Sequence, residues 1–314
     1  MIDPHAEDNV LDGNGHTNQS SKGESPTKNL WNRTGSISAD GLLDARLQAH
    51  FAAHLVGAPA KVFHQPLPDF SHVSLHWSEE SEQFSKLLTE GPVMMLSLEL
   101  ERMLVSLTPN RPGDDVDIPL HGRTLAEVQA AMQEEFSKGK HDQDTPTIPD
   151  PKEWPDHPVA RGAAFDCSDS KAFKELAHHF NNAHTALEEL LHSKQLSSPV
   201  RTWPHHFDMA TLVSLDHELD PEEARSINVG FSPGDGQIAE PYWYVVPYPD
   251  PKRSELPALP HGGYWHTKGW TGAILEASSY ANVASHQEQH GQVAHVLEVA
   301  YDACRTLLEE DSQG

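Results

Sequence analysis

Two runs of short apolar segments, each bracketed by helical patterns, most constrain how this chain of 314 residues folds. Strands are predicted where apolar residues alternate, or form short runs between turn residues. These segments are 72–77, 94–107, 116–120, 209–215, 225–231, 242–246 and 263–275. The segment 94–107 fits one long strand, two strands or a helix. Because the strands come in runs and do not alternate with helices, the sequence predicts an α+β fold with antiparallel sheet.

About four to five helices are expected to flank this sheet. Helical periodicity is clear over 41–57, 169–193 and 284–310. A further helix is predicted from Thr124, where Thr and Glu127 have the spacing of a capping box, to Gly139. In the first helix the stripe is expected to face the core. This stripe consists of Leu43, Leu47, Phe51 and Leu55.

The domain organisation follows from composition along the chain. Residues 1–40 are polar and without apolar periodicity, which predicts a disordered N-terminal tail. Residues 41–312 are then expected to form a single α+β domain. A proline-rich connector over about 140–165 joins two sub-halves, 41–140 and 165–312, which have a similar order of elements but no visible repeat of residues.

Charge and cysteine content narrow the classes of function. The formal net charge is −25, and this acidic chain is also histidine-rich, with 22 histidines. Such a negative field disfavours nucleic-acid and anionic membrane partners and attracts cations. Two cysteines, no membrane-length apolar run and no secretory leader pattern predict a cytoplasmic protein. The sequence does not indicate an oligomeric state.

The segment Trp203-Pro204-His205-His206-Phe207-Asp208 is the strongest candidate for a functional site. If it enters a strand, side chains two apart point the same way, so His206 and Asp208 share a face and His205 lies opposite. A buried His–carboxylate pair that satisfies only itself would have the same spacing.

Two later segments carry comparable residues. By the same alternation, one predicted strand places Glu240, Tyr242 and Tyr244 on one face. The next places His266, Lys268 and Trp270 together. If these strands lie side by side, their polar side chains converge with those of the first segment.

Two imidazoles and a carboxylate on one side of a metal ion suit non-haem iron or catalytic zinc. The sequence therefore predicts a divalent metal, Fe or Zn, held by His206, Asp208 and His266. Glu240 and Lys268 are the predicted catalytic groups. Substrate contacts are predicted from aromatic side chains, which supply apolar walls with polar tips. These are Trp203, Tyr242, Tyr244 and Trp270.

The His206-x-Asp208 pattern with a distant His266 is similar to that of the 2-oxoglutarate-dependent oxygenases. However, no arginine follows His266 at a comparable distance to bind an oxoglutarate carboxylate. Helices that bracket the strands also fit a jelly roll poorly.

Three phrases together carry a family resemblance. They run from Ser198-Pro199-Val200-Arg201 to Asp208, from Gly230 through the 232–236 turn to Tyr244, and from Trp265 to Trp270. They resemble an uncharacterised family of bacterial proteins of the domain-of-unknown-function type. The resemblance implies no activity, and a more distant similar family does not share the His205-His206 pair.

Two functions remain open from the sequence. The first is a cytoplasmic metal-dependent enzyme that acts on a small molecule through a His/carboxylate site on adjacent strands. Acid–base work without a metal is a variant of it. The second is a non-catalytic small-molecule or protein-binding module whose histidines are structural. Whether the chain is an enzyme is not decided by its sequence.

Overall fold

The computed structural model describes residues 31–91, 93–111, 113–138, 156–192, 194, 197–216, 224–251 and 256–311. Most of the predicted tail, 1–30, and most of the predicted connector, 139–155, lie outside these residues. Residues 31–40 are described, and they pack against the rest of the chain. For these ten residues the expected disorder does not hold.

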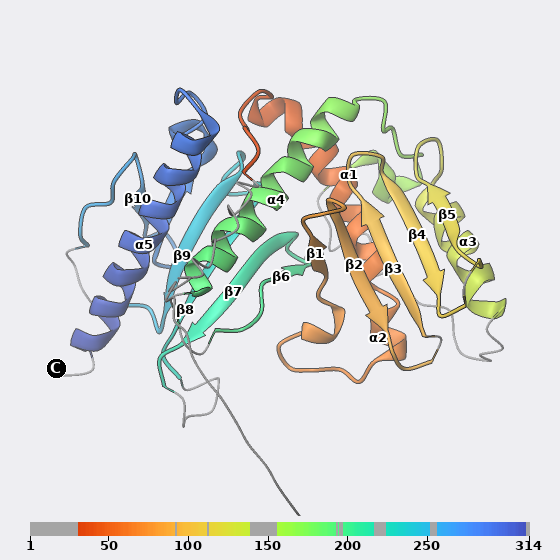
Figure 1. The fold of residues 1–314 in the computed structure, drawn as a ribbon, viewed down its shortest axis with the longest axis horizontal. Coiled ribbons are helices and arrows are strands. Elements are labelled where there is room, and N and C mark those ends of the chain that lie inside the picture. Colours follow the sequence, from red (N-terminus) through yellow and green to blue (C-terminus); the bar gives the residue numbers. More distant parts are fainter. Residues whose placement is uncertain are drawn as a thin grey trace, which may run out of the picture.

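Two antiparallel sheets form the fold, as the runs of strands predicted (Figure 1). The first half of the chain supplies a five-stranded sheet in the order β1-β2-β3-β4-β5. Its strands are β1 (His76–Ser78), β2 (Gln83–Leu88), β3 (Met94–Glu99), β4 (Leu104–Pro109) and β5 (Val116–Pro119). Each strand pairs with the next in sequence, so this sheet is a simple meander.

The second half supplies a six-stranded sheet in the order β10-β11-β9-β8-β7-β6. Its strands are β6 (Arg201–Trp203), β7 (Asp208–Ser214), β8 (Ser226–Ser232), β9 (Tyr242–Tyr248), β10 (Tyr264–His266) and β11 (Gly272–Glu276). The reversal after β9 places β10 at the edge farthest from β6. This strand order determines which of the predicted site residues lie close to one another.

The described residues form five α-helices beside the sheets, and the predicted α+β class is confirmed. They are α1 (Ala39–Gly57), α2 (Ala60–Phe63), α3 (Leu125–Lys138), α4 (Ser170–His192) and α5 (His286–Asp311). The capping box at the start of α3 forms as predicted. The Thr124 amide donates to the Glu127 carboxylate at 2.8 Å, and the Glu127 amide donates to the Thr124 hydroxyl at 3.2 Å. None of the described helices is long and apolar enough to cross a membrane.

The two sheets meet edge to edge. Leu75, just before β1, and Thr202 of β6 exchange two backbone hydrogen bonds of 2.8 and 2.9 Å. At this junction α1 and α4 contact each other. Buried side chains from both halves form one contiguous core.

The six-stranded sheet has one face covered by helices and one that is not. Figure 1 shows α4 and α5 across the same side of it. The row Met209, Phe231, Trp243 and Leu275 joins the main core. The neighbouring row, Ala210, Gly230, Tyr244 and Ile274, points the other way. Its large members form a separate small apolar cluster with Tyr242.

Two expectations about the first half need correction. Segment 72–77 is not one alternating strand: residues 71–73 form a 3₁₀ turn, and only His76 and Trp77 enter β1. Both His72 and Trp77 are buried, which alternation would not allow for a half-buried strand. Segment 94–107 is two strands, β3 and β4, one of the options its apolar run allowed.

Residues 31–38 are attached at several points. The Trp31 ring stacks between Trp243 and His290, with centroids 6.2 and 4.8 Å away. Further along, the buried Glu175 carboxylate accepts the Gly35 amide at 2.5 Å and the Ser36 hydroxyl at 2.7 Å. The segment is thereby fixed to β9, α4 and α5.

Candidate functional site

The Trp203–Asp208 segment is a tight β-hairpin, so the strand alternation assumed for it is wrong. Trp203 of β6 pairs with Asp208 of β7, and the four residues between them form the turn. Phe207 takes a left-handed φ of 58° and turns its ring into the core. His205 and His206 are therefore exposed neighbours at the tip, with ring centroids 4.3 Å apart.

A cavity of about 880 Å³ opens on the face of the six-stranded sheet opposite α4 and α5. Side chains of β7, β8 and β9 form its floor, and α1, the hairpin tip and loop 234–238 form its walls. Both His205 and His206 line it, which corrects the expectation that they point apart. Its volume suits a drug-sized ligand.

Asp208 lies on the floor of this cavity and is held by Tyr244. The Tyr244 hydroxyl donates to Asp208 Oδ2 at 2.5 Å, although the two residues are two strands apart. Tyr244 reaches that far because Gly230 is directly opposite it on β8. A Cβ on Gly230 would be 2.4 Å from the Tyr244 ring, closer than side chains tolerate.

The other oxygen of Asp208 lacks a hydrogen-bond partner in the part of the chain that the structure describes. Asp208 Oδ1 is buried and makes no hydrogen bond with any described residue. Burial raises the pKa of this carboxyl, while the Tyr244 hydroxyl and the nearby His206 lower it. A buried carboxyl oxygen without a donor is costly, so this atom is the point where a ligand gains most.

A second tyrosine–aspartate pair lies beside the first. The Tyr242 hydroxyl donates to Asp235 Oδ2 at 2.7 Å, and the Asp235 Oδ1 accepts the amides of Gln237 and Ile238 at 2.6 and 2.8 Å. All oxygens of Asp235 are thus occupied. Here the carboxylate organises the predicted 232–236 turn, in which Gly234 has a φ of 105°.

Arg46 of α1 enters the same wall. Its guanidinium donates to the Ala239 carbonyl at 3.3 Å and lies against Gly234. Burial lowers the pKa of Arg46, and the negative charge of Asp235 opposes that shift. The arginine is therefore matched by Asp235, not by Asp208.

Three histidines in or near the cavity wall have lowered pKa values. His50 Nε2 is 2.8 Å from the Pro204 carbonyl, and its ring stacks on Phe207. Burial lowers the pKa of His50 to about 4 and that of His54, one turn further, to about 2. Partial desolvation of His205, whose ring lies against Phe70, also lowers its pKa to about 4, and the adjacent His206 adds to the shift.

Sequence reasoning missed the contribution of α1. Leu43 and Leu47 were assigned to the core, but both line the cavity, and Leu43 is 43% exposed. With Arg46 and His50 they have the i, i+3, i+4, i+7 spacing of one helix face. The sequence contained a signal for this, because the helix face formed by residues 43, 46, 47 and 50 carries both apolar and polar side chains, whereas a face in the core would be apolar throughout.

Three of the four aromatic residues predicted to contact a substrate line the cavity. Tyr242, Tyr244 and Trp270 line the cavity. Trp203 packs against the small apolar cluster on this face but is not part of the cavity wall.

His266, Glu240 and Lys268 are not brought to Asp208. They line a neighbouring cavity of about 690 Å³ at the other edge of the sheet. His266 is on β10, four strands from β7, which places it roughly 19 Å away at the usual strand spacing. Its ring stacks on Trp270, and its Nε2 is 2.9 Å from the Lys268 carbonyl.

Glu240 has its own partners in that second cavity. Its carboxylate accepts the Ser278 amide at 2.5 Å. Burial and the neighbouring Glu276 raise the pKa of Glu240, against the lowering effect of Ser278. The Tyr264 hydroxyl in turn donates to Glu276.

The predicted three-ligand metal site is not assembled. Of its members, His206 and Asp208 line one cavity, and His266 lines the other. Across the described parts of the chain, no three His, Cys, Asp or Glu side chains form a group that could hold a metal ion. The donor set found here therefore does not fit the facial triad expected for iron or zinc.

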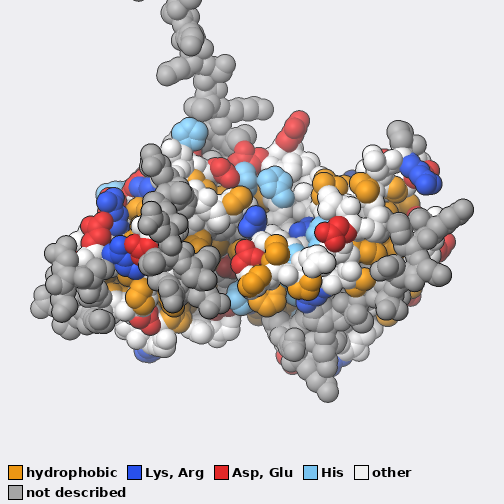
Figure 2. Space-filling model, turned by 90° about the horizontal axis from the view of Figure 1, so that it is seen from below, with side chains coloured by type: hydrophobic (Ala, Val, Ile, Leu, Met, Phe, Trp, Pro, Cys, Tyr) orange, Lys and Arg blue, Asp and Glu red, His pale blue; other side chains and the backbone are white. Residues whose placement is uncertain are grey.

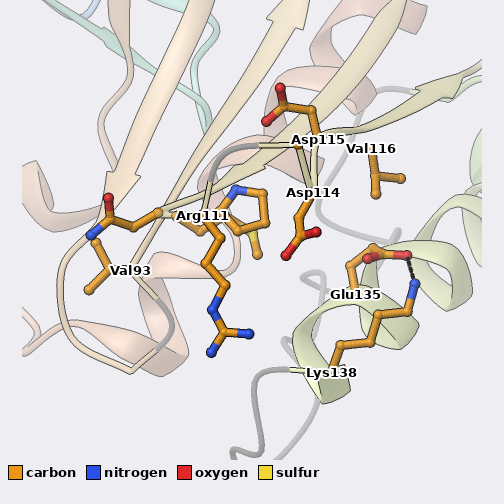
Figure 3. A pocket seen from close by; sticks show the side chains of 11 residues that line it. Val93, Arg111, Asp114, Asp115, Val116, Glu135 and Lys138 are labelled. Carbon is orange, nitrogen blue, oxygen red and sulfur yellow. Dashed lines mark hydrogen bonds and ion pairs between the residues drawn. The ribbon is translucent and has the colours of Figure 1, made fainter.

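The five-stranded sheet carries a different hollow, of about 550 Å³, between its strand ends and α3 (Figure 3). Its side chains are charged: Arg111, Asp114 and Asp115 surround it, and Lys138 pairs with Glu135 at 2.6 Å. On the face drawn in Figure 2, hydrophobic, acidic and histidine side chains are intermingled, and no single type covers it. None of the residues that line this hollow has a buried carboxyl oxygen without a partner, as Asp208 has.

Comparison with known proteins identifies the family alone. No curated protein and no solved structure matches the chain. One family model matches residues 37–314, which include both sheets and all five helices. The chain therefore belongs to the Family of unknown function (DUF5996).

Proposed function

We propose that this chain binds a small molecule in the 880 Å³ cavity and that Asp208 exchanges a proton with it. One observation carries the proposal: the Asp208 carboxyl is enclosed at the floor of the cavity, with Oδ2 held by Tyr244 and Oδ1 unpartnered. A carboxyl whose pKa is raised by burial can give up and recover a proton closer to neutral pH than an ordinary aspartate.

The surrounding residues support binding as well as proton transfer. Leu43, Leu47 and Trp270 offer apolar contact to the body of a ligand. His206 is close enough to Asp208 to affect its pKa and is exposed at the cavity mouth. It is thus placed to pass a proton between Asp208 and solvent. The two cysteines and the acidic composition favour a cytoplasmic setting.

The proposed proton transfer does not involve a metal ion, because only two of the three predicted ligands share a cavity.

Binding without turnover is the second candidate function. It is favoured by the neutral, buried His50, which contacts the Pro204 carbonyl and leaves no free base on that wall.

The first prediction concerns the titration of Asp208. Its pKa, followed by carboxyl carbon NMR, is expected above the ordinary 3.8. Tyr244→Phe should raise it further, because the hydroxyl stabilises the ionised form. Asp117, which accepts a hydrogen bond from Ser106 on the other sheet, is the internal reference signal. A titration of Asp208 at or below the ordinary value would refute the acid–base role.

Binding is tested separately by a fragment screen using ligand-observed NMR. Fragments that bind the wild type should lose about tenfold or more in affinity with Asp208→Asn, and should be unaffected by Asp117→Asn. Fragments that bind equally well to Asp208→Asn would show that they do not contact Asp208 and would refute its role in binding. Turnover of any bound compound, lost with Asp208→Asn, would then separate an enzyme from a binding module.

A further inference from the structure

The hydrogen bonds that the carboxyl oxygens of Asp208 and Asp235 already make limit the chemical class of the ligand. Every oxygen of Asp235 accepts a hydrogen bond, and Asp208 Oδ2 accepts from Tyr244. Asp208 Oδ1 is the only buried carboxylate oxygen of the described side chains that lacks a donor. The ligand atom that completes this site is therefore a donor if the carboxyl is ionised.

Among the described residues, the lysines and arginines that form ion pairs do so with carboxylates other than Asp208. Arg46 lines the same cavity, and the negative charge that acts on it most is that of Asp235. The other titratable groups that line the cavity are His206, His205, His50, Tyr242, Tyr244, Asp156 and Asp235, of which Asp235 raises the pKa of Asp208 and His206 lowers it. Because His50 and His205 are neutral at neutral pH, His206 is the histidine that favours the ionised carboxylate, and a cationic ligand would add to its effect.

The walls near Asp208 suit an organic cation. Tyr242, Tyr244 and Trp270 present aromatic rings to the cavity, and aromatic faces attract ammonium groups. Ile238 and Val246 add apolar surface on the same side. The overall charge of −25 raises the local concentration of small cations.

We infer that the cavity takes a primary or secondary amine on an apolar body, and that its ammonium group donates to Asp208 Oδ1. An ion pair formed away from water is stronger than a neutral hydrogen bond and offsets the desolvation of the carboxylate. This assignment rests on the proposed function, because it requires the same cavity and the same carboxyl.

Three probes of similar shape and different charge test the assignment by titration calorimetry: 2-phenylethylamine, 2-phenylethanol and 3-phenylpropanoate. The amine is expected to bind the wild type about tenfold or more tightly than the alcohol, with the carboxylate weakest. Asp208→Asn should abolish this preference. Asp156→Asn is the matched control, since Asp156 also lines the cavity but is exposed and paired with Arg161.

A measurement on the unaltered chain guards against misfolding of the variant. Where Asp208 is protonated in the free protein, amine binding ionises it and releases a proton. The binding enthalpy measured below its pKa should then depend on the ionisation enthalpy of the buffer, whereas that of the alcohol should not.

The outcomes separate the amine assignment from the proposed function. If the alcohol binds as tightly as the amine and both are lost with Asp208→Asn, the amine assignment falls and the proposed function stands. If all three probes bind wild type and Asp208→Asn alike, both fall. If none binds at millimolar concentration, the amine assignment is overturned, and the fragment screen still decides the proposed function.

Discussion

Gly230 determines whether the Tyr244 hydroxyl can reach the Asp208 carboxyl. Gly230 lies beneath the Tyr244 ring, and an added Cβ would also be 2.8 Å from the Met209 carbonyl. Gly230→Ala should displace the ring, break the Tyr244–Asp208 bond and destabilise the fold by about 1–3 kcal/mol. Urea unfolding gives the stability, and carboxyl NMR gives the pKa of Asp208, which should rise when the bond is lost.

Gly236→Ala is the matched control for this substitution. Gly236 lines the same cavity, and a Cβ there meets nothing within 4 Å. It should leave both stability and the titration nearly unchanged. An unshifted Asp208 pKa in Gly230→Ala would mean that Tyr244 reaches the carboxyl by another route.

The residues of the candidate site could be predicted in part from the sequence. The spacing of His206 and Asp208 predicted that they lie near each other, and both line one cavity, although a hairpin and not a strand brings them there. The orphan Oδ1 could not be predicted, because it depends on Tyr244 crossing a strand over Gly230. Alternation describes single strands and is silent about diagonal contacts between them.

At the scale of elements, α1 has two apolar faces with different roles. Phe51 and Leu55 enter the core, whereas Leu43 and Leu47 line the cavity. Periodicity identifies an apolar stripe but does not state what covers it. The capping box of α3 was predictable because it is complete within four residues, whereas the role of the α1 stripe depends on residues over 150 positions away.

Substitutions on α1 should therefore separate stability from binding. Leu47→Ser is expected to weaken binding of a cavity ligand about five- to tenfold, because apolar contact is lost, with little change in the free energy of unfolding. Phe51→Ala on the same helix should cost about 3–5 kcal/mol, since Phe51 is 1% exposed. Calorimetric titration and urea unfolding measure the two effects. Equal losses of stability in both variants would show that Leu47 packs in the core as Phe51 does.

At the scale of the whole molecule, the sequence predicted the class of fold and most of its elements. It did not predict the strand order, and that order separates His266 from Asp208 by four strands. Sheet order is set by long-range pairing and by the junction of Leu75 with Thr202, neither of which leaves a local pattern. A ligand set spread over several strands is therefore less predictable than one within a hairpin.

The stability of the whole chain should depend on pH through its buried histidines. His54 of α1 is 6% exposed, and burial lowers its pKa from the ordinary 6.5 to about 2. The unfolded chain therefore binds a proton there at a pH where the folded chain does not. The resulting stabilisation is fully present above pH 6.5 and is lost as pH falls, by up to about 2 kcal/mol at pH 5 for this residue.

Urea unfolding at neutral pH and at pH 5 measures this loss, and His54→Phe isolates the contribution of His54. The ring of Phe is apolar and of similar size, so the variant should retain its fold, and its stability should fall less between the two pH values. His50 and His205, whose pKa values are lowered to about 4, contribute losses of the same sign and keep part of the dependence in the variant. A variant with the full wild-type dependence on pH would show that the pKa of His54 is the same in the folded and the unfolded chain, so that burial does not keep His54 neutral.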